Sequence, residues 1–204
     1  MACPSGRLEA VRSAADGGPK HVSLRLLTCI LVMLSAVGHA ADIRVGEKLP
    51  PLRIADLGEC VIHGDETVFE PWESSTMLGK VQIVEYVAAR AGVARLHRPL
   101  YDAIREAGFS AAELAVTKLV NADDALWGTS GLVASKVGEN KKDFPENGLV
   151  VDAKGIGLRR WGLQQGSGAI ALLDRSGDVL FFKEGGLTDD EIHTVVTLIR
   201  ERLR

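Results

Sequence analysis

The residue best suited to chemistry is the single cysteine beyond the first 40 residues. This is Cys60, since Cys3 and Cys29 both lie near the N-terminus. Its thiol could serve as a peroxidatic or sensor group if the surroundings favoured the thiolate. The alternative is a small apolar residue inside a hairpin, because Val61 and Ile62 follow it. No neighbour favours a thiolate, so we prefer the structural interpretation and keep a single-cysteine redox enzyme as the alternative function.

A second candidate group consists of Asn121, Asp123 and Asp124, which follow the apolar run over residues 114–120. That run predicts a strand, and ligands often bind at the carboxyl ends of strands in open α/β sheets. Two carboxylates and an amide could hold a cation or receive a basic peptide. The competing interpretation is turn capping, in which these side chains accept backbone N–H bonds.

Other catalytic patterns are missing from the sequence. The histidines His63, His97 and His193 lack the spacing of a zinc site. The glycines around Gly155 match neither a phosphate loop nor a dinucleotide-binding motif. We therefore expect no metal, no cofactor and no catalytic set, and we do not expect an enzyme.

The first 40 residues have the pattern of an export signal. Basic residues precede an uncharged apolar run over residues 26–37, and Gly38-His39-Ala40 ends on small residues suited to a signal peptidase. The run is well short of the about 20 residues that span a membrane. We predict a signal peptide over residues 1–40 that is cleaved after Ala40, a periplasmic mature chain, and no stable membrane anchor after cleavage.

The predicted mature chain, residues 41–204, is acidic. The whole sequence has 24 Lys and Arg against 27 Asp and Glu, and removal of residues 1–40 leaves 20 against 25, or about −5 with His neutral. Nucleic acids and anionic membranes require a basic surface, so we expect neither as a partner. The length suits a single domain with its own core, and one cysteine excludes an internal disulfide.

Hydrophobic periodicity predicts a mixed sheet with helices on both faces. Apolar runs predict strands over residues 81–88, 114–120, 148–152, 169–173 and 179–182, and a hairpin within residues 52–62 around Asp56-Leu57-Gly58. Helices are expected over residues 95–107, kinked by Pro99 and ended by Gly108, over 130–142, and from a capping box at residues 188–191 to the C-terminus.

Residues 83–100 resemble, without a gap, the active-site segment of thioredoxins. In that register Ala91 and Ala94 stand where the two redox cysteines would be. Methyl groups can neither form a thiolate nor resolve a mixed disulfide. The family's second signature, a cis-proline, is also missing, because Gly168 stands near its position. The resemblance implies a thioredoxin-like scaffold without dithiol chemistry.

The chain more closely resembles the YtfJ family of small exported bacterial proteins, along nearly the whole predicted mature part. The resemblance is carried by residues 45–50, 121–125, 128–129, 139–142 and 174–186. It implies a thioredoxin-like fold and export, and it implies no defined biochemical role.

These observations predict one thioredoxin-like α/β domain over residues 41–204, with an N-terminal β-hairpin extension. We expect a non-catalytic module that binds a periplasmic protein or a small ligand. The expected groove lies between the turn at residues 90–95 and the loop at Ser167-Gly168. The candidate binding residues are Arg90, Arg95, Asn121, Asp123, Asp124, Ser167 and Gly168.

Overall fold

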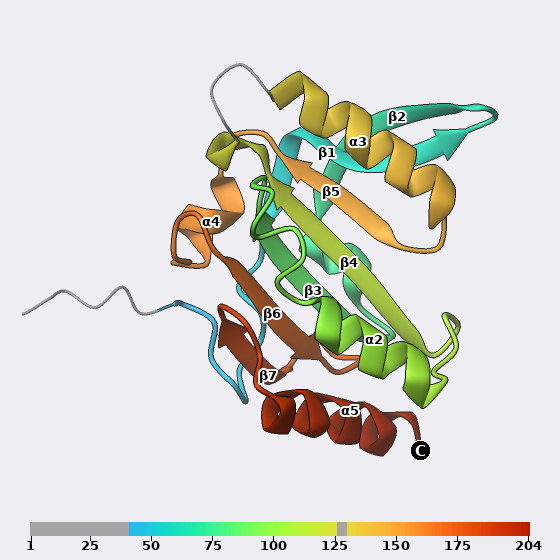
Figure 1. Cartoon of the computed structure of the whole chain (residues 1–204), viewed down its shortest axis with the longest axis vertical. Helices are drawn as coiled ribbons and strands as arrows, with labels where there is room; N and C mark the ends of the chain where they lie inside the picture. Colours follow the sequence, from blue (N-terminus) through green and yellow to red (C-terminus); the bar gives the residue numbers. More distant parts are fainter. Residues whose placement is uncertain (1–40, 126–129) are drawn as a thin grey trace, which may run out of the picture. The chain divides into compact units, whose positions relative to one another are not determined.

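The computed structural model describes residues 41–125 and 130–204, the second range without the side chain of Ser130. The predicted signal peptide lies outside these ranges. The described chain opens with two consecutive strands, continues with strands separated by helices, and ends with two strands and a helix (Figure 1). The strands are β1 (Arg53–His63), β2 (Glu66–Glu73), β3 (Val81–Ala88), β4 (Leu114–Asn121), β5 (Gly148–Asp152), β6 (Gly168–Leu173) and β7 (Val179–Glu184). The helices are α2 (Arg98–Ala107), α3 (Ser130–Asp143), α4 (Ile156–Arg160) and α5 (Asp189–Leu203), with 3-10 turns η1 (Ser74–Met77) and η2 (Ala122–Asp124).

All of these strands belong to one sheet, in the order β2-β1-β5-β4-β3-β6-β7. β3 runs parallel to β4 and antiparallel to β6, and β4 runs parallel to β5. The β1–β2 hairpin joins the sheet through an antiparallel pairing of β1 with β5. Every residue of β3 is buried, including Gln82 and Glu85, as its largely apolar sequence predicts for a central strand. The predicted mixed sheet with an N-terminal hairpin is confirmed.

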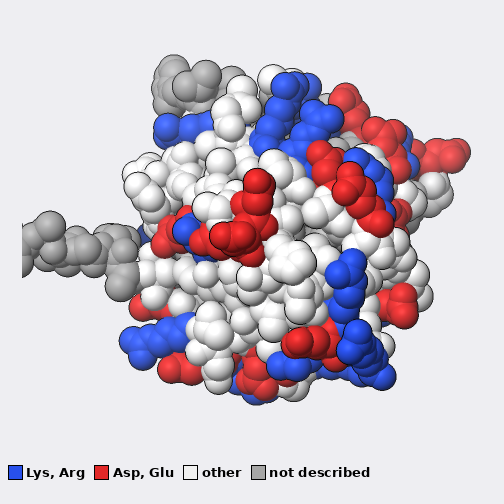
Figure 2. All heavy atoms as spheres, turned by 60° about the horizontal axis from the view of Figure 1, so that its bottom comes forward, with Lys and Arg blue, Asp and Glu red and all other residues white. Residues whose placement is uncertain are grey.

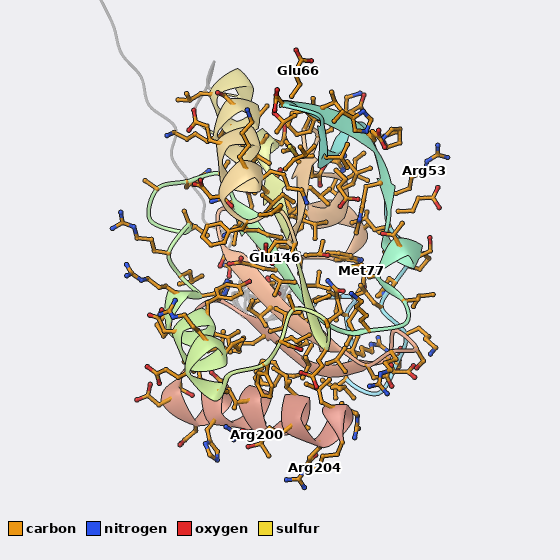
Figure 3. All side chains as sticks on the ribbon, turned by 90° about the vertical axis from the view of Figure 1, so that its right-hand side faces the viewer. Arg53, Glu66, Met77, Glu146, Arg200 and Arg204 are labelled. Atoms are coloured by element: carbon orange, nitrogen blue, oxygen red, sulfur yellow. The ribbon has the colours of Figure 1, made fainter. Side chains whose placement is uncertain are left out.

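Helices cover both faces of the sheet, as predicted, but unequally. Ile83 of β3 packs with Leu100 of α2 and Ile199 of α5, whereas Tyr86 of β3 packs with Trp161 beside α4 on the opposite face. Figures 1 and 3 show α2 and α3 on one side of the sheet, η1, which carries Met77, on the other, and α5 along the bottom of the molecule. The face that α2, α3 and α5 cover also carries Lys118 and Val120 of β4, which line the cleft described in the next section.

The hairpin predicted within residues 52–62 is wrong in position. β1 continues through this segment, and its pairing with β2 has an irregular register there. Leu57 and Gly58 have positive φ angles of 64° and 79°, so the turn-type residues form a bulge. A Cβ on Gly58 would collide with the backbone oxygen of Glu70. The chain reverses at Gly64, between β1 and β2.

Two helix predictions also change. Residues 91–97 form turns, so α2 begins at Arg98 and not at Arg95. Pro99 lies in the first turn of the helix and does not kink it, because a residue without an N–H is tolerated there. Gly108 ends α2 in the left-handed conformation, with φ 74°, as predicted. The short helix α4 was not predicted.

α5 begins at the predicted capping box. The Thr188 hydroxyl accepts a hydrogen bond from Glu191 N at 3.3 Å, and Thr188 N donates to Glu191 Oε2 at 2.8 Å. Among the described residues, no helix has both the length and the apolar character to cross a membrane. On the face shown in Figure 2, Lys and Arg interleave with Asp and Glu, and uncharged areas lie between them.

Candidate binding site

The turn after β3 is fixed by backbone hydrogen bonds from two neighbouring segments. Ala88 N donates to Ser167 O at 3.0 Å, and Ala89 N donates to Asn121 O at 3.0 Å. The turn then presents Ala91 and Ala94, both exposed, before α2 begins. The turn therefore holds in exposed positions the two alanines that the resemblance to thioredoxins aligns with the redox cysteines.

Arg90 connects this turn to the predicted acidic group. Its Nε donates to Asp124 O at 3.0 Å, and its guanidinium lies 3.8 Å from Asp124 Oδ1. The buried carboxylate of Asp124 also accepts from Asn121 Nδ2 at 2.9 Å and from Gly166 N at 3.2 Å. The structure thus brings three predicted site residues together, but their polar groups are directed at one another.

Asp123 takes a different place from its neighbours. It is exposed, and its backbone N–H donates to Asn121 Oδ1 at 3.1 Å, so Asn121 caps η2. In the described parts of the chain, no group of three His, Cys, Asp or Glu residues could hold a metal ion. The geometry of this group is that of a cap which fixes the strand ends.

On the Gly168 side of the turn, side chains fill the space. Gly168 is buried, and a Cβ placed on it would lie 2.9 Å from His97 Cε1 and 3.3 Å from Leu96 Cδ2. Arg95 is exposed to solvent on the turn itself. His97 and Leu96 therefore occupy the region beside Gly168.

A cleft of about 730 Å³ lies on the other side of the turn, between the turn and α3. Its floor comes from β3, β4 and β5, and its walls come from α3 and the turn. We call it the α3 cleft, lined by residues 87–91, 94, 118, 120, 132, 133, 136, 137, 140 and 149. Its volume falls within the about 300–1,000 Å³ usual for small-molecule sites. Among the described residues, its charged lining is basic: Arg90, Lys118 and Lys136.

Below the cleft, a buried network joins β3, β4 and α2. Glu85 Oε1 lies 2.8 Å from His97 Nδ1, and Glu85 Oε2 accepts from Tyr101 Oη at 2.9 Å and Lys118 Nζ at 3.0 Å. His97 Nε2 lies 3.0 Å from Gly185 O. The side chains of Glu85 and His97 are at most 2% exposed, whereas that of Lys118 is 27% exposed. Lys118 therefore connects the network to the cleft.

The network shifts the pKa of two of its members. Burial raises the pKa of Glu85, but the hydrogen bond from His97 and the charge of Lys118 outweigh it, so the net pKa lies below its usual 4.5. Burial, followed by the charge of Glu85, raises the pKa of Tyr101 well above its usual 10.0. At neutral pH, Tyr101 is a neutral hydrogen-bond donor to the Glu85 carboxylate.

Cys60 has the surroundings of a structural residue. Its side chain is fully buried and packs with Val137 of α3 and Leu149 of β5. Burial raises the pKa of its thiol above the usual 9.0, which disfavours the thiolate. These observations support the structural interpretation of Cys60 over the single-cysteine enzyme.

A family comparison agrees with the quoted motifs. The family described as "Bacterial protein of unknown function (YtfJ_HI0045)" matches residues 43–202. The chain belongs to the YtfJ family. The family resemblance read from the sequence is thus confirmed.

Two relatives, from Escherichia coli and Haemophilus influenzae, are similar to this chain over most of its length. "Uncharacterized protein YtfJ" of Escherichia coli K12 is 33% identical over 178 residues, which cover 87% of this chain and 96% of the relative. An "Uncharacterized protein" of Haemophilus influenzae Rd is 34% identical over 168 residues, which cover 82% of this chain and 91% of the relative. Neither name states an activity, so membership of the YtfJ family leaves the function to be argued from the site.

A solved structure of another protein has a fold similar to that of this YtfJ family member. The chain is similar to a protein of Chlorobium tepidum described as a candidate thiol:disulfide interchange protein DsbE, with a TM-score of 0.54 and 20% identity. The similarity covers 80% of this chain and all of the other. At that identity the similarity concerns the fold alone, and it shows that this chain has a thioredoxin-like fold.

The buried network was not predicted from the sequence. Its signal was a single acid, Glu85, in a strand that is otherwise apolar or neutral, and a single base, Lys118, in the next predicted strand. Parallel pairing of β3 with β4 places these two residues directly opposite each other. His97, dismissed as a zinc ligand, is the third member.

Proposed function

We propose that this chain is an exported, non-catalytic thioredoxin-like module that binds a protein segment or a small ligand in the α3 cleft. The observation that supports it most is the combination of a retained turn, alanines at both thiol positions, and a large cleft beside them. Ala91 and Ala94 line that cleft, so the change that removes dithiol chemistry also leaves an apolar wall.

The proposed compartment is the periplasm. Its support is the sequence pattern of residues 1–40, in which a basic segment precedes a short apolar run and a small-residue cleavage site. Cys60 is the cysteine that remains after the proposed cleavage, and it is buried.

A photo-crosslinker at the cleft tests the proposal. The full-length chain is expressed with p-benzoylphenylalanine in place of Ala94, irradiated in cells, and its adducts are identified by mass spectrometry. The matched control carries the same residue in place of Ala112, which is exposed but lies outside the cleft lining. We expect a discrete adduct at Ala94 that is missing at Ala112. Equal adducts at both positions, or none at either, would contradict binding in the cleft.

A further inference from the structure

The network of Glu85, His97, Tyr101 and Lys118 below the α3 cleft has a net charge of one positive unit. Gly185 O only accepts hydrogen bonds, so His97 Nε2, 3.0 Å away, carries a hydrogen. His97 Nδ1 and Glu85 Oε1, 2.8 Å apart, then share one proton, and the pair sums to zero charge whichever atom holds it. Tyr101 is neutral. The charge of the network is therefore that of the Lys118 ammonium.

Lys118 is also the member that meets the cleft. Its side chain is 27% exposed and lines the cleft, whereas the rest of the charged network is enclosed. An ammonium group has three N–H donors. Within the described residues, its recorded acceptor is Glu85 Oε2, at 3.0 Å. Both positive charge and hydrogen-bonding capacity are thus presented to a molecule in the cleft.

The rest of the lining defines what that molecule is. Arg90 is paired with Asp124, Lys136 lies exposed on α3, and no acidic side chain of the described residues lines the cleft. The apolar lining is aliphatic, including Val120 of β4 and Val137 of α3. Such a cleft matches a molecule with an anionic end and an aliphatic body.

We infer that the α3 cleft binds a free aliphatic monocarboxylate, with its carboxylate on Lys118 and its hydrocarbon chain over Val120, Val133 and Val137. This inference rests on the proposed function and names the class of ligand. One negative charge neutralises the network. A neutral alcohol leaves the ammonium unpaired. A dianion carries a second negative charge that the network does not neutralise, and the remaining free cation of the described lining, Lys136, is exposed on α3, where water screens its charge.

Calorimetric titration of the purified protein, expressed as the full chain, distinguishes these classes. The probes are decanoate, 1-decanol and decyl phosphate, which share one alkyl chain and differ in head-group charge. We expect decanoate to bind at one site per chain, and 1-decanol at least about tenfold more weakly, as for loss of a charged hydrogen bond. Decyl phosphate keeps that bond and should bind more weakly than decanoate because its second charge is not neutralised by the network. Equal binding of decanol, or no binding of decanoate up to about 1 mM, would overturn the inference.

Variants show whether Lys118 provides the recognition. Lys118→Met should weaken decanoate binding at least about tenfold. Lys142→Met, on the exposed side of α3 and outside the cleft lining, should stay within about twofold. Because Lys118→Met also removes a partner of Glu85, Glu85→Gln serves as a second variant, in which neutral Gln and neutral His97 leave the same net charge. The Kd of Glu85→Gln for decanoate should lie within about twofold of the wild-type value. A large gain in affinity would contradict the charge count.

The crosslinking experiment separates this inference from the function on which it rests. An adduct specific to Ala94 together with no decanoate binding would keep the α3 cleft as a binding site and reject the monocarboxylate. A protein captured at Ala94 would reject it as well. Decanoate binding that survives Lys118→Met unchanged would place the ligand elsewhere and overturn the inference.

Discussion

Two substitutions of Glu85 should differ strongly in their effect on stability. Glu85→Ala removes the acceptor of three donors, and the enclosed His97 cannot turn to water, whereas Lys118 can reach the cleft. We expect a loss of about 3–5 kcal/mol in the free energy of unfolding, as for a broken buried ion pair. Glu85→Gln keeps an oxygen for Tyr101 and Lys118 and offers an N–H₂ group to a neutral His97. Its cost should be about 1–2 kcal/mol, the difference between charged and neutral hydrogen bonds.

The buried Glu85 carboxylate also predicts a pH dependence of stability. The pKa of Glu85 is lower in the folded chain than its usual value of 4.5, so the unfolded chain binds this proton more readily. The carboxylate therefore contributes stability fully above about pH 4.5, and this contribution is lost as the pH falls through the folded pKa. The free energy of unfolding of the wild type should therefore fall as the pH drops below about 4.5.

Urea unfolding followed by tryptophan fluorescence measures both effects, because Trp72 and Trp161 are buried in the core. The control is Glu66→Gln, because Glu66 is an exposed acid at the β1–β2 turn (Figure 3). This substitution should change the free energy of unfolding by less than about 0.5 kcal/mol. If Glu85→Gln cost as much as Glu85→Ala at neutral pH, the proton-sharing scheme would be refuted. A wild-type stability that stayed constant as the pH fell below about 4.5 would refute the lowered pKa of Glu85.

Three further predictions concern the scaffold. Tyr86→Phe removes the hydroxyl that donates to buried Asp152 Oδ2 at 2.8 Å, and thermal unfolding should show a loss of about 1–3 kcal/mol; no change would contradict the importance of this bond. Gly168→Ala places a methyl 2.9 Å from His97 Cε1, so urea unfolding should show a loss of about 1–3 kcal/mol, and a neutral result would mean that the region beside Gly168 is open. Cys60 should react with a thiol reagent only as fast as the chain unfolds, and rapid labelling of the folded protein would restore the redox alternative.

The parts of the fold that the sequence predicted are those in which local pattern and tertiary context agree. The central strand at residues 81–88 is buried on both faces, and its apolar run has no other use in a domain of this size. The capping box at Thr188 predicts where α5 begins, because it is satisfied within four residues. Such elements need little information from distant parts of the chain.

The errors arose where a local signal had two solutions. Leu57-Gly58 has turn chemistry, but the left-handed backbone that it favours also makes a bulge, and pairing of β1 with β5 selects the bulge. Pro99 fits a kink or a helix start equally well by sequence alone. The preceding turns at residues 91–97, fixed by their contacts, select the start.

The site was predicted in part for a related reason. The turn residues Arg90, Asn121 and Asp124 do meet, because a parallel pair of strands delivers its carboxyl ends to one edge. The partnership of Glu85 with Lys118 depends on strand register, which hydrophobic patterning does not determine between two buried strands. The α3 cleft depends on where a weakly amphipathic helix packs, and no local pattern specified that position.

The buried network is the feature that the fold alone explains least. Replacing a buried ion pair by apolar residues is often neutral or stabilising, so stability does not account for Glu85, His97 and Lys118 below the turn. Ala91 and Ala94, which the resemblance to thioredoxins aligns with the redox cysteines, line the cleft, and one cation of the network, Lys118, is open to the same cleft. A charge that is costly to bury and is open on one side suits recognition of an opposite charge. For that reason binding, and not redox chemistry, is the activity to test at this site.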